Sequence, residues 1–110
     1  MTLQVHFAIL HCNTTESSFS SDKAVLNWDG QDFWNGRIND GEERNTDTFQ
    51  LFPPGKQEAL VSLRDEDTID GSDVLGAQTI RRDELGQGWH VANFTSDDAN
   101  YSLDYEVFEG

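Results

Sequence analysis

Apolar and polar residues alternate along much of this chain, with the period of two that is typical of β-strands with one buried face. Turn residues separate these runs at intervals of about eight to twelve residues, as in all-β proteins. The pattern predicts no helix. It predicts eight strands, over residues 2–12, 23–28, 31–34, 46–52, 57–64, 74–81, 88–95 and 100–108.

Local sequence adds detail to the first half of the chain. Asp29-Gly30 predicts a two-residue hairpin turn, because both positions of such a turn take positive φ angles. Pro53-Pro54-Gly55 ends the fourth strand, since proline lacks a backbone N–H donor. Uninterrupted alternation in the first strand predicts two faces, one with Leu3, Val5, Phe7 and Ile9, the other with His6, Ala8 and Leu10.

The chain has 110 residues, which indicates a single domain over residues 1–110 with one core. No apolar run approaches the roughly 18 residues of a membrane span, so no transmembrane segment is expected. The first residues lack the basic start and cleavage site of a signal peptide. Together with a single cysteine, Cys12, these features favour a cytoplasmic or peripheral membrane location.

The composition is strongly acidic, with a formal net charge of -14. Nucleic-acid binding is not expected, because binding to the phosphate backbone requires clustered Lys and Arg. The seven basic residues are scattered apart from Arg81-Arg82, so a basic patch for phosphoinositides is also not expected. A metal ion would have to supply positive charge for an anionic partner.

Carboxylates gather in two segments that follow predicted strands. Asp65, Asp67 and Asp73 lie between the fifth and sixth strands, while Glu16 and Asp22 flank a serine-rich segment after the first strand. Calcium takes six to eight oxygen ligands, and closely spaced acids can supply several of them. These five residues are therefore the predicted Ca²⁺ ligands. A solvated acidic turn in an acidic protein is the simpler alternative.

The spacing Asp65-x-Asp67-x5-Asp73-x-Leu75-Gly76, with an acid pair six residues apart in an earlier loop, resembles that of C2 domains. The resemblance implies an eight-stranded antiparallel β-sandwich with Greek-key connections. It also implies calcium bound by two acidic loops at one end, and docking on an anionic phospholipid membrane. With acidic loops after strands one and five, the order is similar to the circularly permuted C2 topology.

The first loop departs from the family pattern at two places. Glu16 stands where Asp is usual, and its longer side chain can shift the nearer ion. The next strand reads Lys23-Ala24-Val25 in place of the usual Pro-Tyr-Val. The match is therefore closer in the loop that holds Asp65, Asp67 and Asp73.

Phe19 and Ile69 are apolar residues inside the two polar loops. In a domain bridged to a membrane by calcium, such side chains can enter the headgroup region. They can equally fold back over the base of their own loops, because single exposed apolar residues are common. Both interpretations remain open at this stage.

We expect a binding domain and not an enzyme. His11 and Cys12 are adjacent on a strand and point to opposite faces, so they cannot form a catalytic pair. One alternative is a calcium-dependent carbohydrate-binding module, which requires Trp28, Trp34 and Trp89 to form an exposed, coplanar platform. Another is a protein-interaction domain whose loops calcium only stiffens.

Overall fold

The computed structural model describes residues 2–15, 21–67 and 71–110, with the backbone alone at Asp67, Gly71 and Ser72. Its strands confirm the predicted all-β class. They are β1 (Leu3–Thr14), β2 (Asp22–Trp28), β3 (Gln31–Ile38), β4 (Glu43–Leu51), β5 (Glu58–Asp67), β6 (Gly71–Arg81), β7 (Trp89–Phe94) and β8 (Asn100–Glu109). A 3-10 turn, η1 (Arg82–Glu84), follows β6. Across the described part of the chain, no helix is long and apolar enough to cross a membrane.

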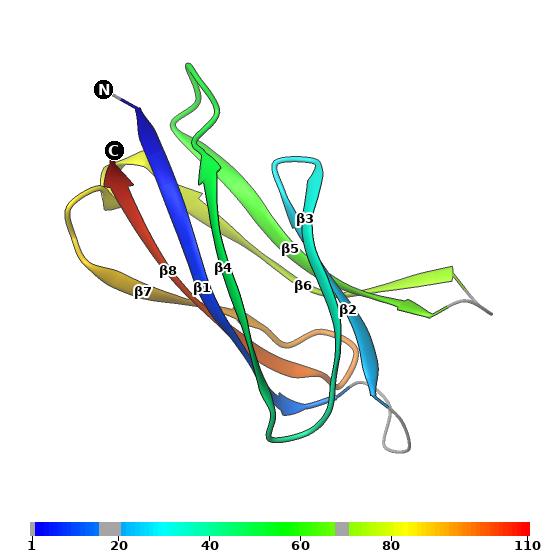
Figure 1. The fold of residues 1–110 in the computed structure, drawn as a ribbon. Helices are drawn as coiled ribbons and strands as arrows, with labels where there is room; N and C mark the ends of the chain where they lie inside the picture. Colours follow the sequence, from blue (N-terminus) through cyan, green and yellow to red (C-terminus); the bar gives the residue numbers. More distant parts are fainter. Residues whose placement is uncertain (1, 16–20, 68–70) are drawn as a thin grey trace.

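The strands form two four-stranded antiparallel sheets that face each other (Figure 1). Sheet A has the order β4-β1-β8-β7, and sheet B has the order β3-β2-β5-β6. Because successive strands run in opposite directions, β1, β3, β5 and β7 all finish at the same end of the sandwich (Figure 1). We call this the loop end. The chain termini lie at the other end, which also holds the β2–β3 turn.

Side chains from both sheets form one apolar core. Its largest fully buried members include Tyr101, Phe7, Phe94, Leu26 and Leu63. The β2–β3 hairpin forms as predicted, with positive φ angles of 49° at Asp29 and 92° at Gly30. Ile38 is fully buried and extends β3 beyond the predicted end at residue 34.

A bulge in β1 changes which residues face the core. The register shifts between Phe7 and Ile9 in the pairings with both β4 and β8. One extra residue reverses the alternation, so Val5 and Phe7 are buried before the bulge and Leu10 and Cys12 after it. The prediction that Ile9 shares a face with Val5 and Phe7, and that Leu10 lies on the opposite face, was therefore wrong.

The acidic segment between the fifth and sixth strands is more regular than expected. β5 continues to Asp67 and β6 begins at Gly71, so most of this segment is a hairpin rather than an open loop. The register shifts between Leu63 and Arg64, which pair with Gly76 and Val74. The shift skips Leu75, which is fully buried.

Gly76 marks the closest approach of β6 to sheet A. Its φ angle is +153°, and a Cβ atom built on it would lie 2.7 Å from the Phe94 Cα atom and 2.8 Å from the Phe94 Cβ atom. The backbone hydrogen bond from Ser96 N–H to the Leu75 carbonyl, at 2.8 Å, joins the same two segments. Only glycine fits this position without moving the backbone of β7.

Replacing Gly76 with alanine is expected to lower the free energy of unfolding by roughly 1 to 3 kcal/mol, the usual cost of overpacking. Urea unfolding measures the change. Gly55→Ala is the matched control, because Gly55 also has positive φ, at +79°, but nothing lies within 4 Å of its Cβ position. An equal loss in both variants would show that backbone conformation alone, and not the contact with Phe94, sets the cost.

Candidate functional site

Asp65 and Asp73 face each other at the loop end. They are directly paired across β5 and β6, and residues opposite each other in an antiparallel pair have Cβ atoms about 4.5 to 5.5 Å apart. Asp65 is only 5% exposed, and its Oδ1 accepts a hydrogen bond from the Lys23 backbone N–H at 3.0 Å. Asp73 is half-buried. Two carboxylates held this closely attract a cation.

Asp22 begins β2 and is fully buried. Its Oδ2 accepts a hydrogen bond from the Tyr101 hydroxyl of β8 at 2.6 Å, a contact that crosses from one sheet to the other. Burial, and then this carboxylate, raise the pKa of Tyr101 far above its ordinary value, so the hydroxyl remains a donor. β2 pairs with β5 through Ala24 and Asp65, which places Asp22 at the same end of sheet B as Asp67.

The remaining predicted site residues lie largely outside the described residues. Glu16, Phe19 and Ile69 are among them, and Asp67 is described only as the last residue of β5. Within residues 2–15, 21–67 and 71–110, no three His, Cys, Asp or Glu side chains are grouped so that they could hold a metal ion. Asp22, Asp65 and Asp73, the predicted ligands whose side chains are described, therefore do not form such a group by themselves.

A third acidic segment, which the sequence did not single out, also lies at the loop end. Residues 39–42 connect β3 to β4, and Asp40 Oδ1 accepts a hydrogen bond from the Thr15 backbone N–H at 2.6 Å. This bond lowers the pKa of Asp40, so its carboxylate is ionised at neutral pH. The alternating direction of the strands could have placed Asp40 at the loop end, because every connection after an odd-numbered strand lies there.

Cys12 lies beneath these carboxylates. Burial raises the pKa of its thiol, and the charges of Asp22, Asp40 and Glu42 raise it further, although a hydrogen bond with Tyr101 acts in the opposite direction. A thiol with a raised pKa is a poor nucleophile. Cys12 is 1% exposed and is a small buried side chain of the core.

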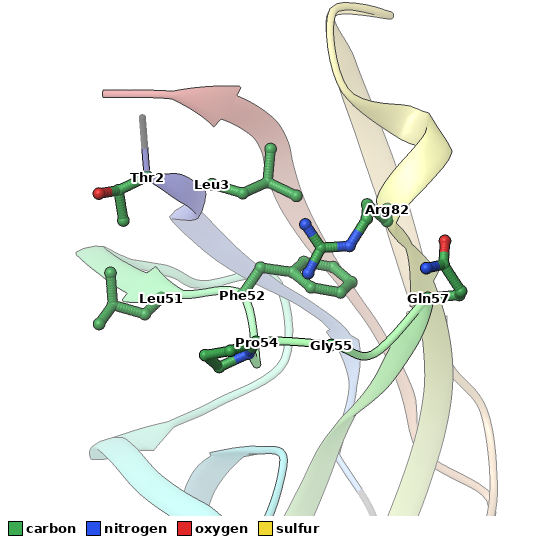
Figure 2. A pocket seen from close by; sticks show the side chains of 8 residues that line it. All are labelled: Thr2, Leu3, Leu51, Phe52, Pro54, Gly55, Gln57 and Arg82. Atoms are coloured by element: carbon green, nitrogen blue, oxygen red, sulfur yellow. The ribbon is translucent and has the colours of Figure 1, made fainter.

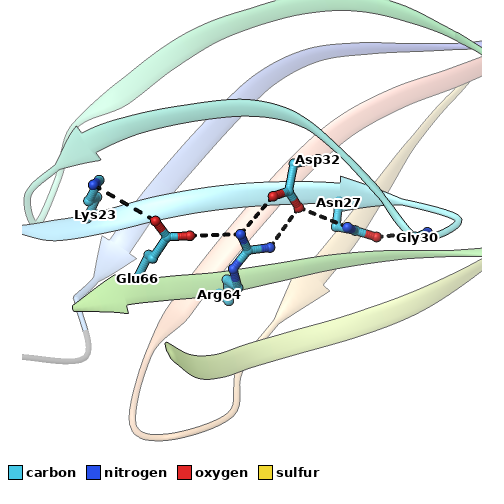
Figure 3. A network of polar contacts seen from close by, with 6 residues as sticks. All are labelled: Lys23, Asn27, Gly30, Asp32, Arg64 and Glu66. Atoms are coloured by element: carbon cyan, nitrogen blue, oxygen red, sulfur yellow. Dashed lines mark hydrogen bonds and ion pairs between the residues drawn. The ribbon is translucent and has the colours of Figure 1, made fainter. Parts of the chain in front are cut away.

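The outer face of sheet B carries a polar network in which cations are already neutralised (Figure 3). Arg64 donates to both oxygens of Asp32, at 2.7 and 2.8 Å, and to Glu66 at 2.8 Å. The guanidinium holds the pKa of Asp32 well below its ordinary value. Lys23 Nζ lies 4.0 Å from the same Glu66. Both cations of this network therefore have acidic partners.

The tryptophans do not form a carbohydrate platform. Trp28 is 4% exposed and donates its indole N–H to the Leu51 carbonyl at 2.9 Å. Trp34 is half-buried against the core, and Trp89 alone is exposed, on β7 of the other sheet. The coplanar arrangement that a sugar-binding module requires is therefore missing.

A hollow of about 500 Å³ lies at the end of the sandwich opposite the loop end (Figure 2). The Arg82 guanidinium lies 4.9 Å from the centre of the Phe52 ring and donates to the carbonyls of Lys56 and Pro53, at 2.8 and 3.1 Å. These bonds fasten the β4–β5 turn to η1. Arg82 therefore has a structural role here.

Comparison with solved structures gives the fold. A structure described as that of a C2 domain matches with a TM-score of 0.63 and 12% identity, over 96% of this chain and 97% of that chain. A C2 domain of plant Extended Synaptotagmin 1 matches with a TM-score of 0.57 and 10% identity, over 97% of this chain and 92% of that chain.

Human GIVD cytosolic phospholipase A2, in complex with methyl gamma-linolenyl fluorophosphonate, matches with a TM-score of 0.60 and 15% identity. The match covers 99% of this chain but 17% of the phospholipase. No protein-family model matches the chain, and no curated protein sequence matches it. With two four-stranded antiparallel sheets and these structural neighbours, the chain has the fold of a C2 domain.

Proposed function

We propose that this chain is a non-enzymatic domain that binds Ca²⁺ at the loop end and docks through it on an anionic phospholipid surface. The carrying observation is that Asp22 and Asp65, two of the five predicted ligands, are buried carboxylates at this end of a C2 fold. Buried carboxylates are rare unless they are paired, hydrogen-bonded or bound to a metal. A solvated acidic turn, the simpler alternative, would leave the carboxylates of Asp22 and Asp65 exposed to water.

The hydrogen bonds of these two carboxylates also support a metal site. Tyr101 holds Asp22 Oδ2, and the Lys23 backbone N–H holds Asp65 Oδ1. Carboxylates that bind metals are themselves usually hydrogen-bonded, because an outer partner fixes their orientation. The proposed ligands are Asp22, Asp65, Asp67, Asp73 and Glu16. Asp40 is an additional candidate from the third connection.

The mechanism is electrostatic. Asp65 and Asp73 lie opposite each other, and like charges in this position repel. Bound calcium would supply the positive charge that offsets this repulsion and would accept oxygen ligands from a partner. Arg64 and Lys23 on sheet B are engaged with acids, so neither offers a free cation to an anionic membrane. The proposed membrane contacts are therefore at the loop end, through Phe19 and Ile69.

Calcium is expected to raise the free energy of unfolding by about 2.7 kcal/mol at one hundred times its dissociation constant. The double variant Asp65→Asn/Asp73→Asn should lose this gain, because two ligand charges are removed. Thermal or urea unfolding with calcium and with chelator measures it. The control Glu58→Gln/Asp83→Asn makes the same change in net charge away from the loop end. An undiminished gain in Asp65→Asn/Asp73→Asn would place the site elsewhere.

Tyr101→Phe is expected to weaken calcium binding by roughly ten- to a hundredfold, the usual cost of losing a group that orients a ligand. Calorimetric titration of chelator-stripped protein measures the affinity. Tyr105→Phe is the matched control, because Tyr105 is on the same strand and donates to Glu84, which lies in η1. Equal calcium affinity in the two variants would contradict the role given to Asp22.

Vesicles that contain phosphatidylserine are expected to sediment with the protein in calcium and not in chelator. Phe19→Ser/Ile69→Ser should weaken this association while leaving calcium affinity in solution unchanged, since each apolar side chain that is fully buried contributes about 1.5 to 3 kcal/mol. Leu60→Ser/Leu85→Ser, at exposed positions elsewhere, serves as the control. If the protein binds calcium but does not associate with vesicles, the alternative function is favoured, that of a protein-interaction domain whose loops calcium stiffens.

A further inference from the structure

The outer face of sheet A combines exposed apolar side chains with acidic ones. Seven large apolar side chains are exposed among the described residues, and four of them belong to this sheet. They lie on its two edge strands, with Phe49 and Leu51 on β4 and Trp89 and Val91 on β7, each 54% to 63% exposed. Apolar side chains that gather on one face mark an interaction site more often than scattered ones do.

The strand pairings place these residues in rows across the sheet. Phe49 is opposite His6, His6 is opposite Glu106, and Glu106 is opposite Trp89. The rings of His6 and Phe49 stack with centroids 4.2 Å apart, and the Trp89 ring lies 5.4 Å from that of His6. One row thus contains three ring side chains and one carboxylate. We call the outer surface of sheet A around this row the aromatic face.

A second row completes the face with another carboxylate. Ile9 is opposite Asp104, and Asp104 is opposite Val91. A groove of about 380 Å³ runs here, and Asp104 is its acidic wall. Its lining residues are Ala8, Ile9, Trp89, His90, Val91 and Asp104. The carboxylates of Asp104 and Glu106 therefore lie along the centre of the face, on β8, with apolar residues on both sides.

The basic residues are absent from this face. The four strands of sheet A, all of them described, contain one Arg and no Lys. That residue, Arg44, forms an ion pair with Glu42 at 2.9 Å. The side chains on the face that can carry positive charge are histidines, and each lies near an acid. His6 is 2.8 Å from Asp47, His11 is 3.0 Å from both Glu43 and Asp104, and His90 of the groove is 3.9 Å from Glu84.

From this arrangement we propose that the aromatic face binds a basic peptide segment of a partner protein, one in which Lys or Arg alternates with apolar residues. The cations would lie over Asp104, Glu106 and the Trp89 ring, since both carboxylates and indole faces attract them. The apolar side chains would cover Val91 and Ile9. An anionic membrane and a second copy of this acidic chain would both be repelled by the same carboxylates.

The first test is an NMR titration of ¹⁵N-labelled protein with an acetylated, amidated seven-residue peptide of alternating lysine and leucine. The three tryptophans give three indole N–H signals, of which that of Trp89 should shift and saturate. The signals of Trp28 and Trp34 should not move, because Trp28 is buried and Trp34 is on sheet B. Peptides with glutamate for lysine, or serine for leucine, should bind at least about fivefold more weakly.

Variants separate a specific face from general attraction to an acidic protein. Trp89→Ala and Asp104→Asn/Glu106→Gln should each weaken peptide binding by at least about fivefold. Leu60→Ala and Glu58→Gln/Asp83→Asn, which change exposed residues elsewhere, should leave it unchanged. The proposal would be overturned if the control variants lost as much peptide affinity as the variants of the aromatic face.

Two further outcomes would assign the face to another occupant and so overturn the proposal. A Trp89 shift that grows with protein concentration, without peptide, would identify a second copy of the chain. A Trp89 shift caused by phosphatidylserine vesicles in the presence of chelator would identify a membrane. These results are distinguishable from failure of the calcium proposal, because no calcium is present in the titration.

Discussion

Apolar contact between the inner faces of the two sheets is the interaction on which the rest of the structure depends. Phe7, Phe94 and Tyr101 of sheet A and Leu26 and Leu63 of sheet B are fully removed from water. Strands that alternate in direction across this core bring four connections to one end. Asp22 and Asp65 lie at this end, where the apolar core finishes, and both carboxylates are buried.

The core and the candidate site share a residue, which links their energetics. Tyr101 packs its ring in the core and reaches Asp22 in the opposite sheet with its hydroxyl. A buried carboxylate without such a partner would cost several kilocalories per mole. Because Tyr101 both packs in the core and holds the Asp22 carboxylate, packing of the core sets the position of Asp22. A site built in this way keeps its geometry while the neighbouring loop sequence changes.

The sequence predicted the strands well because alternation and turn residues are local signals. It failed at Ile9 and Leu10, since a bulge is decided by pairing with β4 and β8, which lie far away in sequence. It identified the carboxylates of two segments but not Asp40, because only the assembled strand order brings that residue beside Thr15. The rows of the aromatic face were equally out of reach. They depend on register across four strands, and no single strand shows that Phe49, His6 and Trp89 come together.

The register shift in the β5–β6 hairpin divides that ribbon into two parts. On one side, Gly76 and Leu75 are fixed by contact with Phe94 and by burial in the core. On the other side, the pairing from Arg64 with Val74 to Asp67 with Gly71 forms an end of the hairpin that extends from the body of the sandwich (Figure 1). Arg64 and Asp65 are still paired with Val25 and Ala24 of β2. Only the part of the hairpin that lies beyond the pair Asp65–Asp73 can therefore be exchanged for another hairpin without changing the core register. The outer end of this hairpin is thus a natural place for grafting, where sequence can change independently of the core.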